Sequence, residues 1–312
     1  MLRFVYRRII LLVPILWGVV TVTFILMYVI PGDPVLTIAG ERYDEKTLQD
    51  MRRELGLDKP IHLQYLNYLI RLARFDLGRS FVTRRPVADA IAERFPRTLV
   101  LAFSAMVLAV VLGVCTGVLA AWGRFPWLGR SFMTVSLIGV SIPVFWLGLL
   151  LIYLFAIKLS LLPPSGYGGG SLRHLILPAL TLSFASMATV ARVTRSGVLD
   201  SVGEDYVRTA RAKGLAELVV MGKHVLRNAL VPVVTIVGTD FGSYLSGSVL
   251  IESIFGWPGL GRFIVQGILK RDFPVIQGSI LFMAVIFILV NLLVDLSYGL
   301  IDPRIRFSRS RR

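Results

Sequence analysis

The chain has 312 residues, of which 55% are hydrophobic, and a formal net charge of +15. This hydrophobic content lies above the ~45–50% of soluble domains and favours a membrane protein. The charge does not indicate nucleic-acid binding, because the basic residues are spread over loops and chain ends and form no single basic face. The single cysteine, Cys115, excludes a disulfide framework and a thiolate metal site.

Six apolar runs follow one another along the chain, each near the ~20 residues that a helix needs to cross a bilayer. They are approximately Ile9–Ile30, Leu99–Trp122, Phe132–Ile157, Leu175–Val193, Leu230–Ile251 and Gly278–Leu300. The first run exceeds the ~7–15 residues of a signal-peptide core, and Pro31-Gly32-Asp33-Pro34 follows it in place of a small-residue cleavage site. We therefore predict an all-α, polytopic membrane protein with six transmembrane helices.

Arginines and lysines set the orientation of membrane proteins, because cytoplasmic loops carry an excess of them. With a cytoplasmic N-terminus, the inner segments hold Arg3, Arg7, Arg8, Arg124, Arg130 and the arginines at 304, 306, 309, 311 and 312. The basic segment 31–97 then lies outside, where long loops carry little weight in this rule. Both termini are predicted to be cytoplasmic.

The external segment 31–97 shows helical periodicity twice. The apolar positions are Leu48, Met51 and Leu55, and then, after Pro60, Leu63, Leu66, Ile70 and Ala73. Two amphipathic helices are expected. They could lie on the outer leaflet, cover a transport path or offer a surface to a soluble binding protein. The sequence is compatible with all three positions.

Several residues indicate how the spans bend and pack. Gly113 with Gly117, and Gly238 with Gly242, have the GxxxG spacing that lets helix backbones approach closely. Pro143 is expected to kink the third span by removing a helix hydrogen bond. Gly168–Gly170 is expected to form the external turn before the fourth span.

The segment Glu204–Leu230 is charged and helix-prone, yet lies between two apolar spans. Ser201 and Glu204 have the spacing of a capping box, so we expect a helix to begin there. Gly214 can end that helix in a left-handed conformation. A second helix is expected over roughly Ala216–Arg227, which makes the segment a loop built for a partner.

Catalytic chemistry is not evident. His62, His174 and His224 fall on different segments, so they cannot converge as metal ligands. No Gly-x-x-x-x-Gly-Lys-Ser/Thr sequence is present, so the chain has no phosphate-binding P-loop. We expect no enzyme activity and no cofactor or metal in this chain.

Asp240 is the one acidic residue predicted near the middle of a span, where an ionisable group is expensive and often functional. It could face a hydrated pathway together with Ser243, which lies three residues further on the same helix face. Alternatively, it could form a structural pair with Arg192 or with another cation at a helix end, or it could lie close enough to a water-filled vestibule for its charge to cost little.

A helix, glycine turn and helix between two spans resembles the EAA coupling loop of ABC-importer permeases. The sequence YVRTARAKGL at 206–215 is similar to the corresponding sequence of the dipeptide, oligopeptide and nickel branch of that family. Further resemblances are PGDP at 31–34, Ser141-Ile142-Pro143, Trp257-Pro258-Gly259 and Arg271-Asp272-Phe273-Pro274. The resemblance covers nearly the whole chain, and it implies the fold of a type I (MetI-like) permease. A short helix near Leu260–Leu269 is expected before the last span.

In the general pattern of this loop a Glu-Ala-Ala triplet precedes the glycine. Here Arg208, Thr209 and Ala210 occupy the triplet, so that only Ala210, Gly214 and Leu226 match the pattern. A role for the first glutamate cannot be carried over, although Glu204 or Asp205 could replace it. The residues assigned to the coupling loop are Ser201, Glu204, Asp205, Arg208, Thr209, Ala210, Arg211, Lys213, Gly214 and Leu226.

The resemblance implies a transport subunit of the plasma (inner) membrane of a bacterium or archaeon. The expected partners are a second homologous permease, two cytoplasmic ABC ATPases that bind ATP and Mg²⁺, and an extracytoplasmic solute-binding protein. Short peptides are the expected cargo, with nickel and glutathione as alternatives. An ion-gradient-driven secondary transporter is the alternative of another class. The expected division is 1–94 (first span and external segment), 95–302 (transmembrane core, coupling loop 201–230) and 303–312 (basic tail).

Overall fold

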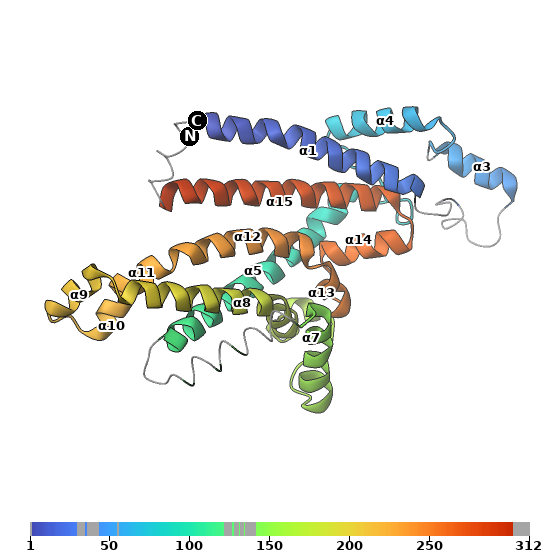
Figure 1. The fold of residues 1–312 in the computed structure, drawn as a ribbon. Coiled ribbons are helices and arrows are strands. Elements are labelled where there is room, and N and C mark those ends of the chain that lie inside the picture. Colours follow the sequence, from blue (N-terminus) through green and yellow to red (C-terminus); the bar gives the residue numbers. More distant parts are fainter. Residues whose placement is uncertain are drawn as a thin grey trace. The chain divides into compact units, whose positions relative to one another are not determined.

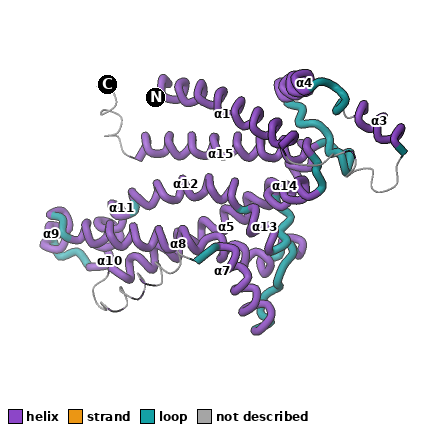
Figure 2. The backbone as a smooth tube through the Cα atoms, turned by 45° about the vertical axis from the view of Figure 1, so that its right-hand side comes forward, coloured by secondary structure: helices purple, strands orange, loops and turns teal. Residues whose placement is uncertain are grey.

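The computed structural model describes residues 2–29, 44–54, 56–121 and 142–301, with Val35, Trp127, Ser131 and Thr134 between them. In this part of the chain the backbone forms helices and loops, and the only β pairing is an isolated bridge between Arg79 and Pro86 (Figure 2). The all-α prediction is therefore confirmed. The chain divides into two compact units, Met1–Thr98 with Pro258–Ile288, and Leu99–Trp257 with Leu289–Arg312.

The helices follow in the order drawn in Figure 1. The first unit holds α1 (Leu2–Val29), α3 (Glu45–Glu54), α4 (Ile61–Ala73), the first turns of α5 (Val87–Ala121), α14 (Leu260–Leu269) and the first half of α15 (Phe273–Ile301). The second unit holds the rest of α5 and α15, with α7 (Val144–Leu151), η1 (Ile152–Lys158), η2 (Gly168–Gly170), α8 (Leu172–Val202), α9 (Asp205–Ala212), α10 (Glu217–Val219), η3 (Val220–Val225), α11 (Leu226–Ala229), α12 (Val231–Gly247) and α13 (Val249–Ile254).

Four described helices are long and apolar enough to cross a membrane: Leu12–Val29, Val87–Ala121, Leu172–Val202 and Phe273–Val294. A fifth is counted if Glu217–Ala229 and Val231–Leu245, which are bent by 52° at their junction, form one broken span. The remaining predicted span, Phe132–Ile157, lies in part outside the described residues, and its described portion Val144–Lys158 is shorter than a span. The number six therefore stays a prediction.

In the first unit, both expected external helices are present as α3 and α4. Tyr68 of α4 is buried against Val20 and Phe24 of α1, and the Phe24 and Tyr68 rings stack with centroids 6.0 Å apart. The PGDP sequence before these helices lies outside the described residues. The external segment is therefore folded onto the first helix over at least α4.

The helix predicted over Leu260–Leu269 is confirmed with the same bounds as α14. Its first free N–H, that of Leu260, donates to the Thr98 hydroxyl at 2.8 Å. After α14, Asp272 is buried, and its carboxylate accepts hydrogen bonds from the Ser80 hydroxyl and from the Phe81 N–H. A buried carboxylate needs such partners to offset its desolvation. Asp272 of the Arg-Asp-Phe-Pro sequence therefore ties Ser80 and Phe81 of the segment 31–97 to the start of α15.

In the second unit, small residues let α5 and α8 approach closely. A Cβ atom added at Gly113 would lie 2.8 Å from the carbonyl oxygen of Met187, and one at Gly117 would lie 2.5 Å from that of Ala191. Gly238 of α12 similarly faces Val294 of α15. The packing role predicted for Gly113, Gly117 and Gly238 is confirmed.

Pro143, which was predicted to kink the third span, has φ −58° and is the N-cap residue of α7. The residues just before Ile142 lie outside the described part of the chain, so the kink stays a prediction. The fixed φ of proline suits a helix start, where its missing N–H removes no helical hydrogen bond. The expected turn at Gly168–Gly170 is confirmed, since φ is positive at all three glycines.

Gly117→Ala should destabilise the second unit, because the new methyl group would push against the backbone of α8. Overpacking of this kind costs about 1–3 kcal/mol, and we expect the melting temperature of the purified protein in detergent to fall by several degrees. Gly18→Ala in α1 is the matched control, because nothing lies within 4 Å of a Cβ atom at that position. Equal melting temperatures for the two variants would contradict the close packing of α5 on α8.

Candidate functional site

The charged loop between α8 and α12 folds as a helical hairpin. α9 leads out from the end of α8, the chain reverses at Gly214, and α10, η3 and α11 lead back to α12 (Figure 1). The second helix predicted over Ala216–Arg227 is thus present from Glu217 to Ala229, with a π-helical stretch in its middle. The helix–glycine–helix prediction for this loop is confirmed.

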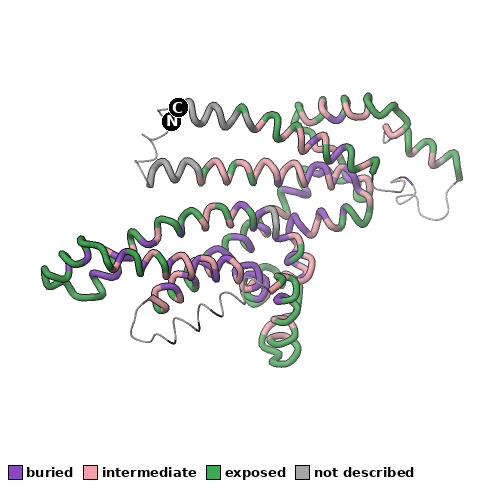
Figure 3. The backbone as a smooth tube through the Cα atoms, in the orientation of Figure 1, coloured by how far each residue is buried: buried purple, intermediate pink, exposed green. Residues whose placement is uncertain are grey.

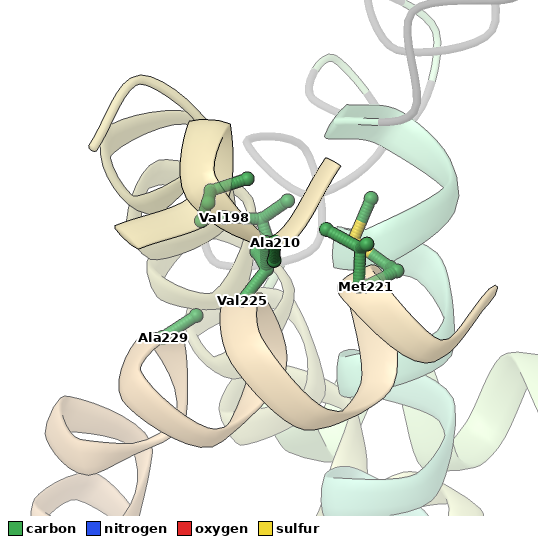
Figure 4. Close-up of a cluster of buried hydrophobic side chains, with 7 residues drawn as sticks. Val198, Ala210, Met221, Val225 and Ala229 are labelled. Atoms are coloured by element: carbon green, nitrogen blue, oxygen red, sulfur yellow. The ribbon is translucent and has the colours of Figure 1, made fainter. Parts of the chain in front are cut away.

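An apolar cluster fixes this hairpin on the end of α8. Its buried members are Val198 of α8, Val207 and Ala210 of α9, Val220, Met221 and Val225 of η3, and Ala229 of α11. Figure 4 shows Val198, Ala210 and Val225 converging from three elements. Four of the seven residues are fully buried, and burying a Val side chain stabilises by about 1.5–3 kcal/mol. The loop is therefore a packed part of the second unit.

The capping box predicted at the start of this loop is wrong. Ser201 is buried in the last turn of α8, and α9 begins four residues later at Asp205. Glu204 is the N-cap residue of α9 and makes no side-chain capping bond. Because burial of Val198 and Ser201 keeps α8 helical up to Val202, the serine cannot also open the next helix.

Gly214 ends α9 as predicted, with φ +76°. The Gly214 N–H donates to the Arg211 carbonyl at 2.9 Å and the Leu215 N–H to the Ala210 carbonyl at 3.4 Å. These two bonds form a Schellman motif, in which a left-handed residue satisfies the last free carbonyls of a helix. The reversal of the loop thus depends on a conformation that glycine adopts without strain.

An ion pair closes the hairpin above this turn. Arg211 of α9 donates to both carboxylate oxygens of Glu217 in α10, from Nε at 3.2 Å and from Nη2 at 2.7 Å. This hydrogen bond lowers the pKa of the Glu217 carboxyl and raises the pKa of the Arg211 guanidinium. Because the pKa of Glu217 is lowered in the folded loop, the ion pair stabilises the loop at pH values above the ordinary pKa of a glutamate. That contribution is lost as the pH falls through the lowered pKa.

The outer face of the hairpin exposes apolar side chains at its tip. Leu215 is 40% exposed, Leu218 74% and Val219 43%, and Tyr206 in the first turn of α9 is 38% exposed. Figure 3 shows exposed residues over most of the tip. A solvated loop that only orients a protein does not need such residues. Clustered exposed apolar side chains are typical of an interaction surface.

The remaining residues assigned to the loop fall on both faces. Arg208 pairs with Asp205 at 3.5 Å, but both are highly exposed, so the pair contributes less than about 1 kcal/mol. The Thr209 hydroxyl donates to the Asp205 carbonyl, and Lys213 is the C-cap residue of α9. Leu226 packs against the buried cluster.

The sequence reasoning missed two groups of residues. Glu217, the partner of Arg211, was not singled out, although it lies across a predicted glycine turn. The buried cluster was missed as well, although Val207 and Ala210 have the i, i+3 spacing of an apolar helix face.

Asp240 and Ser243 both lie on α12. Asp240 is half-buried, and among the described residues it forms no salt bridge with Arg192. Ser243 is exposed, and its hydroxyl donates to the Thr239 carbonyl at 3.1 Å. In the described part of the chain, no three His, Cys, Asp or Glu residues gather as a metal site.

Comparison with protein families matches two consecutive models. Residues 113–307 match the binding-protein-dependent transport system inner membrane component, and residues 1–102 match the N-terminal part of such membrane components. The glutathione transport system permease protein GsiC of Escherichia coli is 46% identical over 307 residues, which are 98% of this chain and all of the relative. The protein of the same name from Shigella dysenteriae matches to the same extent.

Two solved structures share the fold. A chain of the MetNI methionine ABC transporter, in inward-facing conformations, has a TM-score of 0.56 and 19% identity, over 68% of this chain and 96% of its own length. A chain of an amino acid ABC transporter has a TM-score of 0.50 and 21% identity, over 67% and 92%. This chain therefore belongs to the family of binding-protein-dependent transport system inner membrane components, and it is a multi-pass permease of the ABC-importer class.

Proposed function

We propose that this permease carries short peptides inward, with the tripeptide glutathione among them. We also propose that its hairpin loop transmits movements of an ATP-hydrolysing subunit to the membrane helices. The observation that carries the mechanical part is the hairpin itself. Its inner face is buried on Val198 of α8 through six apolar residues of its own, while its tip exposes Leu215, Leu218 and Val219. A movement imposed on the tip is thereby passed to α8 and α12 through packed side chains.

Likeness to the glutathione permeases over almost the full chain supports the cargo. Peptides of this size are polar and charged, so they need a hydrated path through the bilayer. The family assignment favours an ATP-driven importer over the ion-gradient-driven alternative.

The partners follow from the same proposal. A second homologous permease completes the pathway as a heterodimer, two cytoplasmic ATPases bind ATP and Mg²⁺, and a solute-binding protein delivers the peptide from outside. This chain then holds no cofactor of its own and catalyses no reaction. α3 and α4 lie on the outer side, where they could meet the binding protein.

The pathway is assigned to the face of α12 that carries Asp240 and Ser243. A carboxylate facing lipid would cost several kcal/mol, and a water-filled cavity between subunits removes most of that cost. The carboxylate could hold the ammonium group of a peptide transiently.

The coupling role is tested with the complete complex in proteoliposomes that contain ATP, with the binding protein and labelled glutathione outside. We expect ATP-dependent uptake by the wild type and a several-fold loss with Gly214→Val, because a β-branched residue is strained at φ +76°. ATP hydrolysis should then no longer respond to the loaded binding protein.

Gly169→Val is the matched control, because Gly169 has φ +65° and open space around it but lies in the turn before α8. This variant should keep its uptake. Normal uptake by Gly214→Val, with the ATPases still bound, would refute the coupling role of the loop, whereas absence of glutathione uptake by the wild type would refute the cargo.

The orientation is tested by labelling single cysteines in a Cys115→Ala background. A reagent that cannot cross the membrane should label Asp58→Cys in intact cells, or in spheroplasts where an outer membrane intervenes. It should leave Ala216→Cys unlabelled until the membrane is opened. The reverse pattern would place the hairpin outside and overturn the proposed topology.

The pathway assignment is tested with Asp240→Asn. We expect normal assembly with a several-fold change in uptake rate or in the preference between cationic and anionic peptides, since only the charge is removed. Asp50→Asn on the exposed face of α3 serves as the control for loss of one carboxylate. If Asp240→Asn leaves both uptake and preference at the wild-type level, Asp240 does not touch the pathway.

A further inference from the structure

A hollow of about 670 Å³ opens in the second unit between the hairpin loop and the first turns of α12. Its polar side is formed by Lys223, His224 and Arg227, and its apolar side includes Tyr206, Val231 and Val234. No Asp or Glu is among the residues that line it. The hollow thus combines positive charge and apolar surface without a counter-charge.

The two long basic side chains of the hollow have no carboxylate partner within the described residues. Arg208 and Arg211 of the same loop are paired with Asp205 and Glu217. Lys223 and Arg227 are exposed, and within the described residues no carboxylate pairs with either side chain. This side of the hollow therefore presents positive charge with which an anionic ligand can pair.

The apolar side is formed by the first turns of α12, the apolar helix that follows the loop. Val231 and Val234 are 44% and 38% exposed, and their i, i+3 spacing places them on one face of α12. The chain bends by 52° at the junction just before them, between the two halves of a candidate broken span, Glu217–Ala229 and Val231–Leu245. The basic and the apolar side chains of the hollow thus lie on either side of this bend.

We propose that this hollow binds an anionic phospholipid, with its phosphate at Lys223 and Arg227 and an acyl chain along Val231 and Val234. Basic pockets at the ends of membrane helices are suited to anionic headgroups, and each Lys or Arg near the surface contributes about 1 kcal/mol, or roughly fivefold in affinity. A polar protein surface would neutralise the cations but leave both valines against water. A hydrophilic peptide has the same shortcoming, so a lipid fits both sides of the hollow.

The test compares two spin-labelled lipids, phosphatidylglycerol and phosphatidylcholine, bound by the complete complex in nanodiscs. We expect the wild type to prefer phosphatidylglycerol, and the double variant Lys223→Gln/Arg227→Gln to lose at least about fivefold of that preference. Exchanging the two residues, as Lys223→Arg/Arg227→Lys, keeps both charges and should keep the preference.

Lys270→Gln is the matched control, because it removes an exposed lysine of the first unit that lies outside the hollow. It should keep the preference.

The proposal is overturned if the wild type shows no preference, if the double Gln variant keeps it, or if millimolar inorganic phosphate abolishes it, since the site would then hold a free anion. It is also overturned if Arg227→Cys forms crosslinks to an ATPase subunit in the complete complex, while a photoactivatable phosphatidylglycerol does not label the hollow of the wild type. None of these outcomes depends on the cargo, so a failure of the glutathione proposal would be seen separately.

Discussion

The hairpin loop depends on one physical constraint: a charged segment between two membrane helices can hold a fixed shape only if it buries an apolar face of its own. Seven residues from α8, α9, η3 and α11 provide that face. The ion pairs of the loop are exposed, and pairs of that kind contribute little, whereas each buried valine contributes about 1.5–3 kcal/mol. The shape of the loop is therefore set by burial, and its charges are left available for partners.

Much of this fold could be predicted from the sequence because the bilayer leaves few solutions. A segment that spans the bilayer must form its backbone hydrogen bonds within itself, so apolar runs of the right length indicate helices. α14 was predicted with its observed bounds, and the apolar periodicity of α3 and α4 was sufficient to find them. Gly214 was predictable because glycine is the residue that most often takes a positive φ after a helix end, although Phe75, Ser160 and Arg271 also do so in this chain.

The error at the start of the loop has a physical cause. Ser201 was interpreted from local spacing, but tertiary packing decided where α8 stops. α8 stays helical through Ser201 because Val198 and Ser201 are buried beneath the hairpin. Motifs of two residues specify a boundary weakly, whereas an apolar face repeated over three turns specifies an element strongly.

The two faces of the hairpin also explain how this loop tolerates arginine at the first position of its triplet. Arg208 is exposed and pairs only with Asp205 on its own helix, while Ala210, at the third position, is buried in the cluster. A larger side chain at Ala210 would press on Val198 and Val225, but a changed charge at Arg208 alters only the outer surface. The positions that match the general pattern, Ala210, Gly214 and Leu226, are the ones that the fold of the loop requires. Arg208 and Thr209, the two triplet positions that depart from the pattern, are exposed, so their side chains are free to vary without disturbing the buried cluster.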